Sequence, residues 1–592
     1  AAAERLNELR ERSGGGGEGL VALAVSLGAG VGVLLAAALV VIWLGLTLTY
    51  LGLFVAAGAL AAVLLLSGAE AYARLVAGVA VMTATFTALL QGLRLLLSGS
   101  HPVTAVAKNV LSEAVRMKIS LVFIVLLILG MSALPGVLAE DQPLRYRVQT
   151  FLQFGTTGTF VLLAVLTLLF GCATVAFEQR DRVIWQTMTK PVSVWQYLLG
   201  KWAGIAALNA VLLAVCASGV FLFTEYLRGQ PANGEVAAYV AAGQEELPPE
   251  QRLPTEDRMI LESQVLVARR SVTPTAPIAP DDPDLQRLVA ERIEQERRAG
   301  TQGVDTAAFR EKIASDLYKS VLRELRNIPP AMPPFGERVF TFEGLGEART
   351  SERPITLRYK PSWGSNAPDE TYPLTFVFAD GSTEVRTHAP GVFHTMALRP
   401  TAVDELGTLE LSVLNGRLFR APNGSIGFQP NPKTARFEEG DLEVSYSVGS
   451  YRANFLRVVA VLWLKLAFLG MVAVTASTFL SFPVAALVSL GFFFIAEMSG
   501  YLTDAVTFVH TTDDDGNFLW FQGTATYVAT FVSRGLRVYS DLRPAGRLVE
   551  GRVLPWSQLA LAASVFLAAA GVLFAAGGAA MRRRELAVYS GQ

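Results

Sequence analysis

The sequence has few cysteines and few charges. Its 592 residues include two cysteines, and 17% of the residues are charged, whereas soluble domains carry roughly 25%. Cys172 and Cys216 both lie in apolar stretches, which excludes a disulfide scaffold. The four histidines are scattered and form no cluster with the cysteines, so the sequence predicts no metal site. The formal net charge of −1 argues against a nucleic-acid-binding protein.

The missing charge is concentrated in long apolar runs. A bilayer span needs roughly 20 apolar residues, because backbone polar groups find partners in lipid only within a helix or a closed barrel. Residues 20–67 are long enough for two spans, with a break near 45–50. Together with the other runs they predict about nine membrane helices, the others at 75–97, 119–138, 151–177, 197–223, 455–480, 482–502 and 556–580.

Lys465 is singled out as the charge that lies well inside one of these runs. Two interpretations stand: a side chain that reaches the interface by snorkelling, and a functional intramembrane charge. We expect the first.

Basic residues near span ends favour the cytoplasm. Residues 582–584 are three arginines that directly follow the last run, which predicts a cytoplasmic C-terminus. Counting back through the spans places two further basic segments, 101–118 and 178–196, on the same side. The same count places residues 226–453 and the loop 504–554 outside, and we expect a bacterial inner membrane.

The composition of the polar region 226–453 predicts an inserted folded domain. Residues 226–280 are Pro-rich and irregular, and residues 283–327 show helical spacing that breaks at 299–305. From 336 to 450 short alternating runs predict six or more strands, with Asn415-Gly416 as one hairpin-type turn signal. The sequence thus predicts an α-helical polytopic membrane protein with an inserted extracytoplasmic α+β domain that contains a β-sandwich.

The remaining segments complete the predicted organisation. Residues 1–19 form a glycine-containing tail whose charges are mixed in sign, unlike a signal peptide. Residues 20–98 carry three additional spans. The two halves of a six-span core are expected at 99–225 and 454–592.

One cytoplasmic segment resembles a known family. Glu178 is followed by Pro-Val-Ser at 191–193 and by Tyr-Leu-Leu-Gly-Lys at 197–201. This order resembles the coupling segment of type-2 ABC transporter permeases, and is closest to the subgroup that includes the copper-enzyme-maturation permeases. Arg182 and Val183 stand where the family usually has Gly-Thr.

The resemblance implies a coupling helix at about 178–196 that a separate cytoplasmic ATPase contacts. It implies that coupling residues are Glu178, Arg180, Asp181, Arg182, Lys190, Pro191, Ser193, Tyr197, Gly200 and Lys201. The preceding segment resembles the family's interfacial helix, which implies a role there for Glu113, Arg116 and Lys118.

The chain shows no ATP-binding motif of its own, because Gly200-Lys201-Trp202 lacks the flanking residues of a phosphate loop. ATP and magnesium are therefore expected on the partner, with no cofactor and no enzymatic activity in this chain. Six core spans are half a permease, which implies a homodimer or a heterodimer with a second permease in the membrane lipid.

Three functions remain open from the sequence. The first is a permease that couples ATP hydrolysis to export or transbilayer movement of an unknown substrate. The second is a mechanotransmitting subunit that moves its extracytoplasmic domain without transporting a solute. The third is a membrane-anchored receptor or assembly scaffold. The inserted domain is expected to bind a ligand or a protein, or to act as a spacer.

Overall fold

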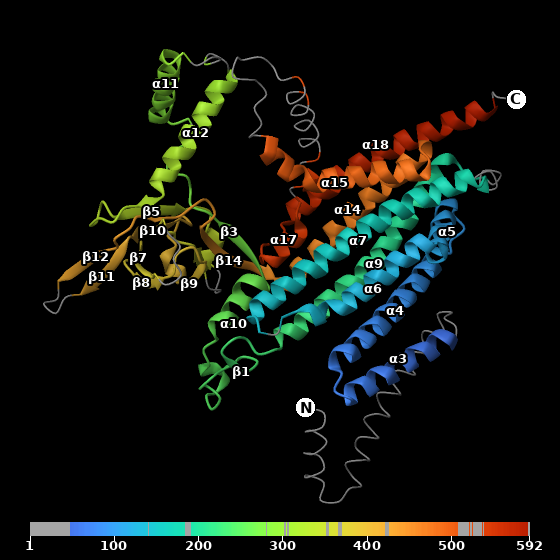
Figure 1. Cartoon of the computed structure of the whole chain (residues 1–592), viewed down its shortest axis with the longest axis horizontal. Helices are drawn as coiled ribbons and strands as arrows, with labels where there is room; N and C mark the ends of the chain where they lie inside the picture. The colour runs from blue at the N-terminus through green and yellow to red at the C-terminus, as the bar shows by residue number, and fades with distance from the viewer. Residues whose placement is uncertain are drawn as a thin grey trace, which may run out of the picture.

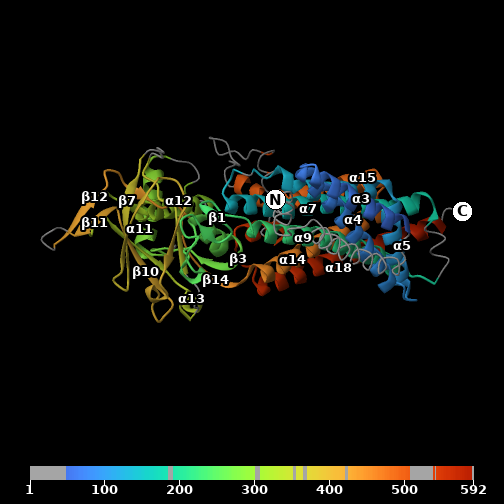
Figure 2. The same cartoon turned by 90° about the horizontal axis from the view of Figure 1, so that it is seen from below.

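The protein is elongated, with a helical bundle in one half and a strand-rich domain in the other (Figures 1 and 2). The computed structural model describes residues 48–589 apart from 140, 184–190, 280, 301–303, 305–306, 351–354, 365–369, 421–424, 507–519, 521–523, 525–535, 537 and 541. The predicted tail 1–19 and the first predicted span lie outside the described residues.

Seven helices within the described residues are long and apolar enough to cross a membrane. They lie in α4 (Glu70–Leu96), α6 (Lys118–Ala133) with its 3-10 extension η1 (Leu134–Val137), α7 (Leu144–Arg180), α9 (Val194–Arg228), α14 (Tyr451–Phe479), α15 (Phe482–Val506) and α18 (Trp556–Tyr589). The second predicted span falls on α3 (Leu48–Leu66), whose apolar stretch Leu51–Leu66 is shorter. These helices fit a polytopic membrane protein.

The centre of the bundle is formed by α7 and α14, which are the most deeply buried of the seven helices. Their apolar side chains pack with those of α9 in one hydrophobic core. Few residues of α4, α6 and α18 are buried inside the bundle, as expected for helices that face lipid. α7, α9, α14 and α18 run the length of the bundle, so each has one end at the inserted domain and one at the opposite end, which we call the far end (Figure 1).

A shorter helix, α5 (Pro102–Arg116), lies at the far end and packs along α9. Its buried face consists of small and branched apolar residues, namely Val106, Ala107, Val110, Leu111 and Ala114. Lys108 and Arg116 lie on the exposed face. This division is typical of an amphipathic helix.

The inserted domain contains two four-stranded antiparallel sheets. One has the order β5-β10-β7-β8 and the other β3-β14-β6-β9. Side chains of both sheets, among them Phe376 and Leu357, share a single hydrophobic core. The strands are β3 (Val267–Val272), β5 (Glu337–Phe342), β6 (Ile355–Tyr359), β7 (Tyr372–Phe378), β8 (Thr383–His388), β9 (His394–Leu398), β10 (Leu409–Leu414) and β14 (Leu442–Ser450).

The remaining elements are smaller. Two helices, α11 (Pro283–Arg298) and α12 (Ala307–Leu325), form a projecting pair (Figure 1). The other elements are β1 (Glu235–Ala237), β2 (Val240–Ala241), η2 (Pro249–Gln251), α10 (Glu256–Ile260), η3 (Leu261–Val265), β4 (Asn327–Ile328), α13 (Gly346–Thr350), η4 (Pro400–Ala402), β11 (Gly416–Arg420), β12 (Ile426–Pro430), β13 (Ala435–Arg436) and α17 (Pro544–Val549).

Two details of the domain differ from the sequence-based expectation. Asn415-Gly416 does not form a hairpin turn, because β11 pairs with β12 and β10 pairs with β5 and β7. The Asn415 side chain is buried and donates hydrogen bonds to the carbonyls of Ile328 and Lys433. The segment expected to be irregular contains β3, which is ordered by pairing with β14 far along the chain.

The domain and the bundle are joined without a linker at one point. β14 ends at Ser450 and α14 begins at Tyr451. The Ser450 side chain accepts a hydrogen bond from the Ala453 amide and so caps the helix. The central strand of one sheet is therefore continuous with a central helix of the bundle.

Candidate functional site

A buried lysine organises a polar cluster at the far end of the bundle. Lys201 lies in the first turns of α9, and its side chain is 2% exposed. Its Nζ lies 2.8 Å from Glu178 Oε1 and 3.4 Å from Glu113 Oε2. It also donates to the Thr174 hydroxyl at 2.8 Å and to the Thr174 carbonyl at 3.1 Å. One ammonium group thus connects α5, α7 and α9.

The two carboxylates are held by further hydrogen bonds. The Tyr197 hydroxyl donates to Glu178 Oε2 at 2.6 Å, and the Thr174 hydroxyl donates to Glu113 Oε2. A buried ammonium is tolerated only when it is paired and hydrogen-bonded, and this cluster meets both conditions. Because two carboxylates face one lysine, the cluster is net negative when all three groups are ionised.

Helical spacing brings these residues together. Thr174 and Glu178 are four residues apart on α7, and Tyr197 and Lys201 are four residues apart on α9, so each pair shares a helix face. The cluster unites four predicted residues, namely Glu113, Glu178, Tyr197 and Lys201. Thr174 was missed, although its position one turn before Glu178 was the available signal.

Gly200 and Gly204 let α5 approach α9 closely. A Cβ added at Gly200 would lie 2.6 Å from Val106 Cβ, and one added at Gly204 would lie 2.6 Å from Val110 Cβ. Both distances are too short for real carbon contacts. Small residues four apart on a membrane helix commonly serve such close packing.

The variant Gly200→Ala/Gly204→Ala is therefore expected to push α5 away from α9 and to lower the free energy of unfolding. Overpacking costs about 1–3 kcal/mol per site. Equilibrium unfolding of the purified chain in detergent measures the loss. The matched control is Gly130→Ala in α6, where an added Cβ meets nothing within 4 Å; equal stability of both variants would contradict the close contact.

The described residues between α7 and α9, 181–183 and 191–193, are mostly exposed. α7 ends at Arg180, and Arg182 has a positive φ of 59° that turns the chain out of the helix. Arg180 and Asp181 form an exposed ion pair at 2.8 Å, and the Arg180 guanidinium lowers the pKa of the Asp181 carboxyl by donating a hydrogen bond to it. Lys190 lies outside the described residues.

α9 begins at a reciprocal cap. The exposed Ser193 side chain accepts from the Gln196 amide, and the Gln196 side chain accepts from the Ser193 amide. Residues 178–180 belong to α7 and residues 194–196 belong to α9. The middle of the predicted coupling helix, 184–190, lies outside the described residues, so that helix stays a prediction. Pro191 is exposed ahead of this cap.

The other predicted residues of the interfacial helix lie apart from the cluster. Arg116 ends α5 and Lys118 begins α6, and both side chains are exposed. Met117, between them, is extended and makes the turn from one helix to the next. Glu113 is thus the residue of this group whose side chain reaches the buried lysine.

A second intramembrane ion pair corrects the expectation for Lys465. Its side chain is 3% exposed, and its Nζ lies 2.8 Å from Glu497 Oε1 on α15. The snorkelling interpretation is wrong, because the ammonium is buried against a carboxylate and not exposed at an interface. Glu497 was overlooked, although it is visible in the sequence within the run 482–502.

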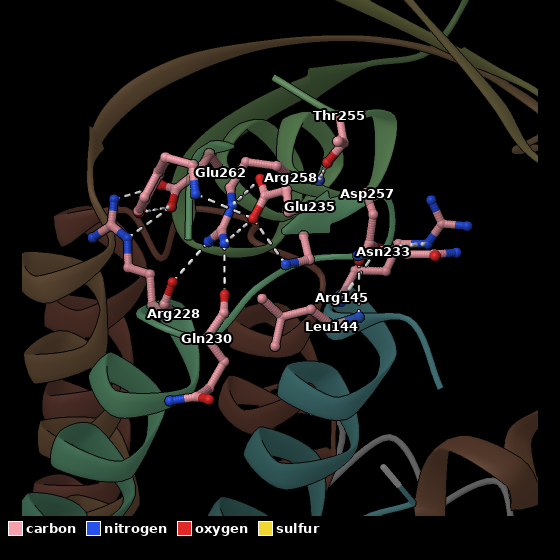
Figure 3. A network of polar contacts seen from close by, with 12 residues as sticks. Leu144, Arg145, Arg228, Gln230, Asn233, Glu235, Thr255, Asp257, Arg258 and Glu262 are labelled. Atoms are coloured by element: carbon pink, nitrogen blue, oxygen red, sulfur yellow. Dashed lines mark hydrogen bonds and ion pairs between the residues drawn. The ribbon is translucent and has the colours of Figure 1, made fainter. Parts of the chain in front are cut away.

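A polar junction at the opposite end ties α7 and α9 to the inserted domain (Figure 3). Arg258 of α10 forms an ion pair with Glu235, and both side chains are 1% exposed. The Arg258 Nη2 atom lies 2.7 Å from Glu235 Oε2. Arg258 also donates to the carbonyls of Arg228 and Gln230, each at 2.7 Å, just where α9 ends. Burial raises the pKa of Glu235, but the bonds from Arg258 and the Ala232 amide outweigh it, so that pKa is lowered.

The neighbouring residue caps the other helix. The Asp257 carboxylate accepts hydrogen bonds from the amides of Leu144 at 2.8 Å and Arg145 at 3.4 Å, at the start of α7. An acidic group at a helix N-terminus satisfies free amides and is favoured by the helix dipole. α7 and α9 are consequently fixed to each other at both ends, by Lys201 at the far end and by α10 at the domain.

Comparison with known proteins places the polar cluster in a recognised segment. The sequence model of a family described as ABC-2 family transporter protein matches residues 104–243. This part of the chain is similar to the ABC-2 family transporter proteins. It begins in α5 and extends past the end of α9, so it contains all five residues of the Lys201 cluster. No curated protein and no solved structure matches the chain.

The ABC-2 match confirms the resemblance to type-2 ABC transporter permeases. Together with the seven apolar helices, it supports a multi-pass, membrane-embedded subunit of an ABC transporter. Such subunits generally carry no enzymatic activity. The match names the family and no subgroup within it.

Proposed function

We propose that this chain is the permease subunit of an ABC transporter, and that a separate ATPase drives it through the segment between α7 and α9. The observation that carries the proposal is the Lys201 cluster, which joins the end of α7 and the start of α9, the helices on either side of that segment, to each other and to α5. A push on the chain between these two helix ends would therefore be applied to three helices together.

The proposed sidedness follows the positive-inside rule. α5, the end of α7 and the end of α18 lie at the same far end of the bundle (Figure 1), and the three basic regions of the sequence lie in or next to them. The far end would face the cytoplasm and the inserted domain the outside. The substrate would cross a core formed with a second permease copy or a related chain.

Lys201 is unsuited to binding ATP, which supports placing hydrolysis on the partner. Its Nζ is occupied by Glu178, Glu113 and Thr174, and Gly200 packs against α5. In a phosphate loop these two residue types would face a nucleotide.

The proposal predicts that an ATPase copurifies with the full chain in mild detergent, and that Arg180→Glu removes it. Charge reversal on an exposed side chain leaves the fold intact but alters the contact surface. The measurement is ATP hydrolysis in the purified complex, with mass spectrometry to detect a protein that carries a phosphate loop.

Arg287→Glu in α11 is the matched control, because it is an equally exposed reversal in the inserted domain; it should retain the ATPase. A wild-type chain that copurifies no ATPase would refute the proposed function. Full retention of the ATPase by Arg180→Glu would refute the role of this segment.

A further inference from the structure

A cavity of about 850 Å³ lies where the bundle meets the inserted domain. α7 contributes Gln153, Thr157 and Phe160 to its wall, and α14 contributes Leu462 and Lys465. The opposite wall comes from β3 and from the chain around α17. This size is in the range of sites for small organic ligands.

Basic side chains dominate the described lining. Six of them face the cavity, namely Arg269, Arg270, Lys465, Arg543, Arg547 and Arg552. Two carboxylates, Glu497 and Glu550, line the same space. The lining charges are therefore net positive, which favours an anionic ligand.

Part of this wall is rigidly built. Glu443 receives Arg269 at 2.7 Å and Arg552 at 3.0 Å, one on each carboxylate oxygen. The Arg269 amide donates to the Gly551 carbonyl, and the Val553 amide donates to the Arg269 carbonyl, so the chain before α18 is attached to β3. Desolvation raises the pKa of Glu443, but its contacts with Arg269, Ser271 and Arg552 outweigh that effect and lower it.

The membrane side of the cavity holds the Lys465–Glu497 ion pair beside aromatic and apolar side chains. Lys465 Nζ lies 5.0 Å from the centre of the Phe160 ring and 4.0 Å from that of Tyr539. Leu462 lies one helical turn before Lys465 on α14. An ionisable residue at this depth marks a functional site by default, and here it borders a basic cavity.

We propose that this cavity binds an anionic amphiphile, with its phosphate or carboxylate group against the arginines of the wall formed by β3 and the chain around α17, and its apolar chain against Phe160 and Leu462. Arginine is suited to this role because its planar guanidinium binds such groups through two parallel hydrogen bonds. The inference rests on the proposed function in one respect: in a permease, the bound amphiphile is the class of molecule transported.

The test uses the purified full chain in a neutral detergent, with its unfolding temperature measured against added lipid. The probes are phosphatidylglycerol, phosphatidylcholine with the same acyl chains, and inorganic phosphate. A saturable rise is expected with phosphatidylglycerol alone. Arg543→Gln/Arg547→Gln is expected to raise the half-saturating concentration about tenfold or more, a free-energy change of about 1.4 kcal/mol.

Two variants control this comparison. Arg452→Gln removes a charge from an exposed arginine on α14 that pairs with Glu225 and does not line the cavity, so it should bind as the wild type does. Arg543→Lys/Arg547→Lys keeps the charges but loses the paired hydrogen bonds of the guanidinium, so its half-saturating concentration should lie between those of the wild type and the glutamine variant, which separates lost charge from misfolding.

Each other outcome overturns the proposal. Equal stabilisation by phosphate would show that the apolar chain is not recognised, and equal loss in Arg452→Gln would show general surface attraction. If the unfolding temperature rises without saturating, the lipid has no defined binding site in the cavity. If the chain retains its ATPase but binds no lipid, the proposed ligand site is refuted and the proposed function stands. Saturable binding in a chain that copurifies no ATPase would refute the transport of the ligand.

Discussion

Lys201→Met is expected to destabilise the folded chain by about 3–5 kcal/mol, because removal of one partner leaves buried charge uncompensated. The Glu178 and Glu113 carboxylates are both mostly shielded from water and both lie against Nζ of this lysine. Methionine preserves the apolar stem but offers no ammonium. Equilibrium unfolding in detergent measures the loss, and hydrolysis by the copurified ATPase should lose its dependence on this chain.

Lys108→Met is the control for this experiment, because Lys108 is an exposed lysine on the adjacent helix α5. Surface substitutions of this kind change stability by roughly 0.5 kcal/mol or less. A double variant Lys201→Met/Glu178→Gln should recover part of the loss, since one of the two unpaired carboxylates becomes neutral. If Lys201→Met and Lys108→Met were equally stable, the buried cluster would be refuted.

Arg258→Met is expected to lower the free energy of unfolding by about 3–5 kcal/mol as well, although Arg258 lies at the opposite end of the bundle. The change leaves Glu235 buried without its cation and removes the donors to two carbonyls at the end of α9. Hydrogen exchange should increase at the amides of Leu144 and Arg145, which the adjacent Asp257 caps.

The double variant Arg258→Met/Glu235→Leu distinguishes a lost ion pair from lost packing. It removes both charges and should be less destabilised than Arg258→Met alone, because no buried charge remains unpaired. Arg298→Met, on the exposed surface of α11, should be close to the wild type. Additive losses in the double variant would mean that the two side chains act independently.

The sequence predicts well what depends on local composition. The runs at 151–177, 197–223 and 556–580 fall within α7, α9 and α18, and the run at 455–480 ends one residue beyond α14. The reason is that a largely apolar run can satisfy its backbone in lipid only as a helix or in a closed barrel. The break at 299–305 falls between α11 and α12, since Gly300 and the polar residues around it interrupt the apolar spacing.

What depends on distant partners was not predictable. α7 extends beyond its apolar run to Leu144 because Asp257, 113 residues away, caps it. β3 carries Arg269, Arg270 and Ser271 and lacks the apolar alternation of an isolated strand, yet it pairs with β14. The family motif indicated Glu178 and Lys201, but only the fold brings Glu113 of α5 to the same ammonium group.

The unbroken passage from β14 into α14 limits how the two halves of the molecule can move. β14 is hydrogen-bonded to β3 on one side and to β6 on the other, so torsion of α14 about its own axis would be transmitted to the whole sheet. The chain before α18 is attached to β3 as well. The domain therefore cannot rotate freely relative to the bundle. We expect a rotation of α14 to change the orientation of the domain.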